Sequence, residues 1–114
     1  MAPEPGRTPI SGCVISYQEA DRIADCVRSL AFCDEVVVVD SGSTDGTVDL
    51  ARSLGARVVH NAPFPGHKEQ KQIAVDLAAH DWVFCLDADE RATLIELLSK
   101  LASAAREPWV NHRF

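Results

Sequence analysis

The sequence lacks the features that would assign the chain to a membrane or to a nucleic acid. No apolar run approaches the roughly 18 residues that a membrane-spanning helix needs. The chain carries 11 basic and 17 acidic residues, and its net charge of −6 argues against non-specific binding to nucleic acid or to an anionic membrane surface. A phosphate-bearing ligand would therefore need local cations or a metal ion to offset the carboxylates.

The cysteines do not occur in metal-binding or redox spacing. The four cysteines are Cys13, Cys26, Cys33 and Cys85, and no two of them form a CxxC pair. Because Cys13 and Cys85 lie inside apolar runs, we expect reduced structural thiols rather than a disulfide or a zinc site. Reduced thiols are typical of the cytoplasm, which is the compartment we expect.

Several catalytic signatures are absent as well. The sequence contains no HExxH or HxxxH pair, no GxSxG turn, no GxGxxG and no Gly-Lys-Ser/Thr phosphate loop. We therefore expect His60, His67, His80 and His112 on the surface or in loops. The sequence therefore gives no support for a zinc peptidase or a serine hydrolase. It also gives none for a P-loop or a GxGxxG dinucleotide site.

The sequence does contain short apolar runs that alternate with segments whose apolar residues have helical spacing. The chain has 114 residues, which is enough for one domain. The pattern predicts strands at 10–16, 35–40, 56–60 and 81–87, each followed by a helix, at about 20–31, 43–55, 67–79 and from Thr93 onward. Residues 35–40 are apolar on both faces, as in a parallel strand covered by helices. Strand–helix units in succession predict an α/β fold with a parallel sheet. We expect a flexible leader over 1–8, the domain over 9–106 and a tail over 107–114.

Sequence features also place the helix ends and faces. Ser43 or Thr44 is the expected N-cap of the second helix, with Gly55 past its end. The third helix is expected to bury Ile73, Ala74, Leu77 and Ala78. The last helix opens with a capping box at 93–96 and is expected to bury Leu94, Leu97, Leu98 and Leu101.

Polar residues follow three of the strands at the edge where parallel sheets bind ligands. Asp87 and Asp89 stand two positions apart, so their side chains would project together. Two carboxylates that close repel each other unless a cation lies between them. The pair therefore indicates either a Mg²⁺ or Mn²⁺ ion bridging a diphosphate, or only an acidic entry to the next helix.

Asp40 and the lysines of the third helix leave alternatives open. Asp40 ends a run of four valines, and it could cap the turn that follows or accept hydrogen bonds from a base or a ribose. Lys68 and Lys71 would lie in the first turns of the third helix. Either lysine could be a solvated surface residue or could contact a phosphate there.

Three segments, VISYQEADRIADCVRSL (14–30), EVVVVDSGSTDGTVDLARSLGARVV (35–59) and DWVFCLDADE (81–90), occur in an order and spacing that resemble family 2 glycosyltransferases of the type-A fold. They are most similar to bacterial lipopolysaccharide-core β-glucosyltransferases, over about residues 9–105. The resemblance implies a Rossmann-like parallel sheet of order 3-2-1-4 with helices on both faces.

The resemblance also implies a nucleotide-diphosphate sugar donor, a UDP-sugar such as UDP-glucose, with Mg²⁺ or Mn²⁺ and inversion at the anomeric carbon. Ser16, Tyr17 and Glu19 would line the nucleoside pocket and Asp40 would bind the base. Lys71 would point at the nucleotide, Asp87 with Ala88 would contact the ribose or metal, and Asp89 would be a metal ligand. The acceptor would be a lipopolysaccharide core glycan, and peripheral membrane association stays open.

The chain departs from the family in two respects. Gln18 and Gln72 stand where asparagine is usual, which affects fine positioning. The family is also considerably longer, and its second half supplies the acceptor site and the catalytic base. We assign no catalytic residue here, since Glu90, Glu96 and Glu107 are the only carboxylates after the Asp87-Ala88-Asp89 segment.

The shorter length leaves other functions open. The chain could be a catalytically silent nucleotide-sugar binder or a non-functional interaction fragment. Lacking the second half, the apolar surface around Trp82, Phe84 and the last helix would be uncovered. We therefore expect a homo-oligomer formed through the fourth strand and that helix.

Overall fold

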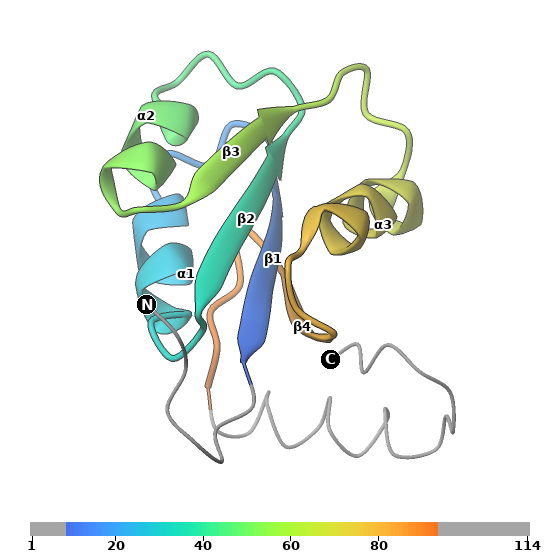
Figure 1. Ribbon diagram of the computed structural model, residues 1–114. Coiled ribbons are helices and arrows are strands. Elements are labelled where there is room, and N and C mark those ends of the chain that lie inside the picture. The colour runs from blue at the N-terminus through green and yellow to red at the C-terminus, as the bar shows by residue number, and fades with distance from the viewer. Residues whose placement is uncertain (1–8, 94–114) are drawn as a thin grey trace.

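The computed structural model describes residues 9–93, which form a four-stranded parallel sheet flanked by helices (Figure 1). The elements are β1 (Ile10–Ser16), α1 (Ile23–Ser29), β2 (Glu35–Asp40), α2 (Thr47–Ser53), β3 (Arg57–His60), α3 (His67–Leu77) and β4 (Trp82–Asp87). The strand order is β3-β2-β1-β4, so the predicted α/β fold and its 3-2-1-4 order are confirmed. The leader at 1–8, the helix expected after Thr93 and the tail at 107–114 lie outside the described residues.

Helices cover both faces of the sheet, as the apolar runs predicted. α1 and α2 lie on one face and α3 on the other (Figure 1). Val38 belongs to the core cluster on the α1 and α2 side, whereas Val37 and Val39 belong to the cluster on the α3 side. Alternate side chains of β2 thus fill two different cores, which explains why the strand is apolar throughout.

The predicted N-cap of the second helix is wrong. α2 begins at Thr47, and its N-cap is Gly46, which has a φ of 93°. Asp45 satisfies the helix end, because its Oδ1 accepts hydrogen bonds from Thr47 N at 3.1 Å and Thr47 Oγ1 at 2.5 Å. Ser43 and Thr44 are engaged in the loop that precedes the helix. The prediction failed because partners distant in sequence occupy both hydroxyl groups.

α3 buries a polar residue that the helical pattern did not predict. Ala74 is fully buried as predicted, and Gln70 is fully buried beside it. Ile73, Leu77 and Ala78 are only half-buried, and they pack against the core cluster on this face. The helix therefore presents a narrower apolar stripe than predicted, with an amide group at its end nearest the loop.

β4 lies at one edge of the described sheet. The expectation that Phe84 lies on an uncovered face is wrong, since Phe84 is fully buried and Phe32 packs edge-on against it at 5.8 Å between ring centroids. Assembly through β4 therefore stays a prediction that rests on its backbone edge and not on exposed aromatic side chains.

Sedimentation at high micromolar concentration measures that assembly. We expect a mass twice the 12.4 kDa of one chain, because one self-complementary strand edge suffices to close a dimer. A single species of the monomer mass would contradict this prediction.

Candidate functional site

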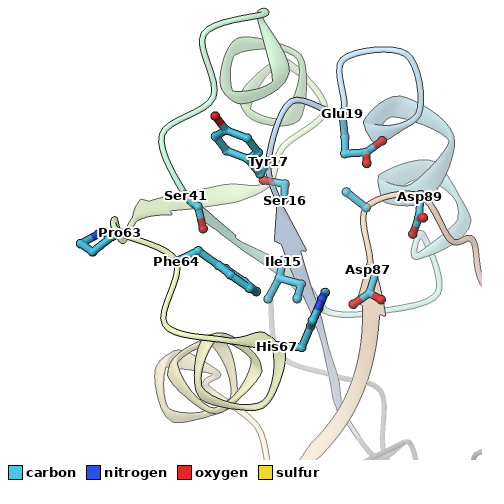
Figure 2. Close-up of a pocket in the computed structure, with 11 residues that line it drawn as sticks. Ile15, Ser16, Tyr17, Glu19, Ser41, Pro63, Phe64, His67, Asp87 and Asp89 are labelled. Carbon is cyan, nitrogen blue, oxygen red and sulfur yellow. The ribbon is translucent and has the colours of Figure 1, made fainter.

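A cavity of about 530 Å³ opens at the carboxyl ends of β1 and β4 (Figure 2). It is lined by Ile15, Ser16, Tyr17, Glu19, Ser41, Pro63, Phe64, His67, Asp87, Ala88 and Asp89. The structure thus brings together most of the residues selected from the sequence. The other two do not line the cavity but contact residues that do, Asp40 through Ser16 and Lys71 through Asp87.

Asp40 organises the turn after β2. Its side chain is buried, and Oδ1 accepts hydrogen bonds from Ser16 Oγ at 2.7 Å and Ser43 Oγ at 2.6 Å. Oδ2 accepts hydrogen bonds from the N–H groups of Gly42 at 3.0 Å and Ser43 at 2.7 Å. Burial alone raises the pKa of Asp40, but the hydrogen bonds from Ser43, Ser16 and Gly42 outweigh burial and hold that pKa below its ordinary value. The turn-capping alternative is therefore realised, and contact with a base stays a prediction.

Gln18 joins the loop after β1 to the loop before α2. Its backbone lies in the left-handed region, with a φ of 53°, where asparagine is more common than glutamine. Gln18 N donates to Ser43 Oγ at 2.8 Å, and Gln18 Oε1 accepts from Thr44 N at 2.6 Å. These bonds hold an uncommon backbone conformation in place, and they explain why Ser43 and Thr44 do not cap α2.

The same two loops are joined again near the start of α1. Glu19 N donates to Thr47 Oγ1 at 2.9 Å, and Ala20 N donates to Asp45 Oδ2 at 3.0 Å. The hydrogen bonds from Thr47 and Ala20 lower the pKa of Asp45. Tyr17 and Glu19 therefore project from a loop that is fixed at several points.

Each carboxylate of the Asp-Ala-Asp segment lies near a cation of the chain itself. Lys71 Nζ is 3.1 Å from Asp87 Oδ1, a buried oxygen atom, in an ion pair whose angles are not those of a hydrogen bond. Arg22 Nη1 is 3.8 Å from Asp89 Oδ2. Asp89 is exposed, so its pair with Arg22 contributes little stability. Lys71 does not point freely into solvent, and the charge of Asp87 is already offset in this structure.

Glu90 closes the turn after β4. Its Oε1 accepts a hydrogen bond from Asp87 N at 2.8 Å, and its N–H donates to Asp87 O at 2.9 Å. Glu90, one of the three carboxylates that follow the Asp-Ala-Asp segment, therefore has a role in the turn. Glu96 and Glu107 lie outside the described residues.

The donor atoms fit a divalent cation that is shared with a ligand. Asp87 and Asp89 supply carboxylate oxygens to one cavity. Over residues 9–93, no group of three or more His, Cys, Asp or Glu side chains could hold a metal ion. Mg²⁺ commonly binds through one or two carboxylates together with ligand phosphates, so this small donor set suits a metal–diphosphate complex.

Sequence reasoning missed the wall of the cavity formed by residues 61–67. Pro63, Phe64 and His67 line the cavity from this loop, which the sequence had placed only as a connection. Phe64 is 45% exposed, and its ring meets that of His67 edge-on at 5.1 Å between centroids. An aromatic residue between two prolines, next to the sheet edge that binds ligands, was the available signal. His67 is exposed as predicted, but it is the first residue of α3 and it also lines the cavity.

Comparison with known proteins assigns the family. The family model described as glycosyl transferase family 2 matches residues 11–111. The chain belongs to this glycosyltransferase family. A lipopolysaccharide core biosynthesis glycosyltransferase, LpsC of Rhizobium meliloti, is 39% identical over 108 residues, which are 89% of this chain and 40% of that protein. An uncharacterised glycosyltransferase of Rickettsia felis is 46% identical over 82 residues, which are 71% of this chain and 29% of that protein. The chain thus spans less than half the length of these relatives.

Solved structures share the fold of this glycosyltransferase chain. Glucosyl-3-phosphoglycerate synthase from Mycobacterium tuberculosis, in complex with Mn²⁺, UDP and glucosyl-3-phosphoglycerate, matches with a TM-score of 0.64 and 28% identity, over 88% of this chain and 40% of that one. Mannosyl-3-phosphoglycerate synthase from Rubrobacter xylanophilus matches with a TM-score of 0.68 and 23% identity, over 89% of this chain and 37% of that one. Both support the type-A fold. In the described part of the glycosyltransferase chain, no helix combines the length and apolar character that crossing a membrane requires.

Proposed function

We propose that this chain binds a nucleotide-diphosphate sugar together with Mg²⁺ or Mn²⁺, as the donor-binding part of a glycosyltransferase that acts on a lipopolysaccharide core. The observation that carries the proposal is the single cavity that Tyr17, Glu19, Asp87 and Asp89 line at the carboxyl ends of β1 and β4. Ligands of open parallel sheets bind at this edge. The name of the curated relative supports action on a lipopolysaccharide core, and the UDP- and Mn²⁺-bound neighbour supports this class of donor.

Within this proposal the residues have separate roles. Asp89 and Asp87 would hold the metal ion, which would offset the negative charge of the diphosphate leaving group. The nucleoside side is lined by Ser16, Tyr17, Glu19 and Ala88. Asp40 contacts the base. Lys71, whose Nζ lies 3.1 Å from Asp87 Oδ1, would supply positive charge to a diphosphate oxygen of the donor.

Sugar transfer with inversion needs a base that takes the proton of the acceptor hydroxyl. Glu90 is engaged with the backbone of Asp87, so we do not propose it as this base. We propose that the 114-residue chain binds the donor without transferring the sugar. Incubation with UDP-glucose and a lipopolysaccharide core acceptor is expected to give no transfer product. Turnover would show that a base is present, with Glu90→Gln as the first variant to examine.

Amide chemical shifts test the site directly. Titration of UDP in the presence of Mg²⁺ is expected to shift the signals of residues 15–19 and 87–89. The signals of residues 79–81, at the opposite end of the sheet, are expected to stay in place. Shifts at both ends alike, or at neither, would contradict the proposed donor site and would favour an interaction fragment without a ligand.

Lys71→Met is expected to change two affinities in opposite directions. Binding of Mn²⁺ alone should tighten about fivefold, because Asp87 loses the cation that lies 3.1 Å from its Oδ1. Binding of UDP in the presence of Mn²⁺ should weaken about tenfold, since a charge-assisted contact to phosphate is lost. Electron paramagnetic resonance of free Mn²⁺ measures the first affinity and calorimetry the second.

Lys68→Met is the matched control, since Lys68 is an exposed lysine on the same helix. It should leave both affinities unchanged. A decrease of both affinities in Lys71→Met would mean that Lys71 only supports the shape of the site.

A further inference from the structure

The cavity has two chemically different ends. The carboxylates of Asp87 and Asp89 lie on one side, and Pro63, Phe64 and Ser41 lie on the other (Figure 2). A nucleoside diphosphate has the same polarity, with a charged group that needs a counter-ion at one end and a planar aromatic ring at the other. If the diphosphate occupies the carboxylate end, the base must lie toward Phe64.

Two exposed aromatic rings border this second end. Tyr17 is 58% exposed and Phe64 is 45% exposed, although both are large apolar groups beside a cavity. In Figure 2 the ring of Tyr17 lies on one side of the Ser16 and Ser41 side chains and the ring of Phe64 on the other. Stacking on a planar base would remove apolar ring surface from water.

The Phe64 side of the cavity is held in place before any ligand arrives. Gln70 is fully buried, and its Nε2 donates a hydrogen bond to Ser41 Oγ at 2.9 Å. Its Oε1 accepts a hydrogen bond from Asn61 Nδ2 at 2.8 Å, and Asn61 N donates to Asp40 O at 2.8 Å. One buried amide thus ties the loop before α3 to the turn after β2. A wall that is already ordered loses little entropy when it binds a ligand.

We propose that Phe64 covers one face of the nucleobase, and that the 61–67 loop therefore determines how tightly the base is held. The inference rests on the proposed donor site and extends it to a residue outside the strand-end motifs. It assigns Phe64 to the base and not to the metal or the diphosphate.

Calorimetry of the full chain with Mn²⁺ distinguishes the base end of the cavity from the diphosphate end. The two probes are UDP, which has a base, and inorganic pyrophosphate, which has none. Phe64→Ala is expected to weaken UDP binding by about tenfold, the usual effect of losing one base–aromatic stack. Pyrophosphate binding should not change. Phe64→Tyr keeps an aromatic face and should restore the affinity for UDP. Leu50→Ala, at an exposed apolar residue of α2, is the control and should behave as the wild type.

Each other outcome overturns the inference in a recognisable way. Unchanged UDP affinity in Phe64→Ala, with normal binding by the wild type, would show that the base does not contact Phe64 while the donor site stands. Equal losses for UDP and pyrophosphate would show that Phe64 supports the whole cavity. Absence of UDP binding by the wild-type chain would refute the proposed function and this inference with it.

Discussion

Asp89→Ala is expected to abolish the dependence of nucleotide binding on Mg²⁺ or Mn²⁺. Asp89 lines the cavity with 47% of its side-chain surface exposed, and its Oδ2 lies 3.8 Å from Arg22 Nη1. A metal ion can therefore displace that weak ion pair at small cost. Loss of a second-shell partner lowers metal affinity by 10–100-fold, so loss of a direct ligand should lower UDP affinity on the order of 100-fold. The remaining affinity should be the same with Mn²⁺ and with a chelator.

Asp49→Ala removes the same charge from an exposed position in the first turn of α2 and serves as the control. It should retain metal-dependent binding. If Asp89→Ala bound UDP as tightly as the wild type and only when Mn²⁺ was present, Asp89 would not be a metal ligand. The carboxylates of the Asp-Ala-Asp segment would then only precede the next segment of the chain, without binding a metal ion.

Asp40→Asn is expected to lower the free energy of unfolding by about 3 kcal/mol at neutral pH. The asparagine has the same shape, but one oxygen acceptor becomes an NH₂ donor that faces hydroxyl and N–H donors. The buried carboxylate accepts four hydrogen bonds, two on each oxygen, so two of them lose their acceptor whichever oxygen is replaced. Urea unfolding followed by circular dichroism measures the difference, with Asp49→Asn as a surface control.

The loss should depend on pH in a defined direction. The native pKa of Asp40 is lowered, so its stabilising effect is complete above the pKa of an unfolded aspartate, about 3.9. The effect disappears as the pH falls through the native pKa. The gap between wild type and Asp40→Asn should therefore be constant near pH 7 and narrow below about pH 4. Equal stability at neutral pH would contradict the role assigned to the Asp40 turn.

Asp40→Asn also tests the predicted contact with the base. The variant protein that remains folded should bind UDP about tenfold more weakly if Asp40 accepts a hydrogen bond from the base. An unchanged affinity would assign Asp40 to the turn alone.

The strands and the strand order could be predicted because their signals are local or general. β1 and β2 have the bounds that the apolar runs predicted, and Val37, Val38 and Val39 are buried on alternate faces. The order of the strands followed from the resemblance to a known fold. The side chains that follow β1 and β4 could be placed at one site because parallel strands end at the same edge.

Side-chain partners could not be predicted, because they join residues far apart in the chain. The start of α2 depends on bonds between Gln18 and both Ser43 and Thr44, so the local capping rule failed. The burial of Gln70 follows from the positions of Ser41 and Asn61, which no helical period encodes. The sequence of β4 alone gave no sign that Phe84 is covered. Phe32, from a segment distant in sequence, packs against its ring.

Titration of the wild-type chain with UDP, once with Mn²⁺ and once with a chelator, tests the central claim most directly. Calorimetry is expected to show one UDP per chain when Mn²⁺ is present and a loss of affinity of about 100-fold or more when it is removed. The reason is that the cavity presents Asp87 and Asp89 to an anionic ligand in a chain of net charge −6. Equal affinity under both conditions, or no binding under either, would contradict a metal-dependent donor site at this edge of the sheet.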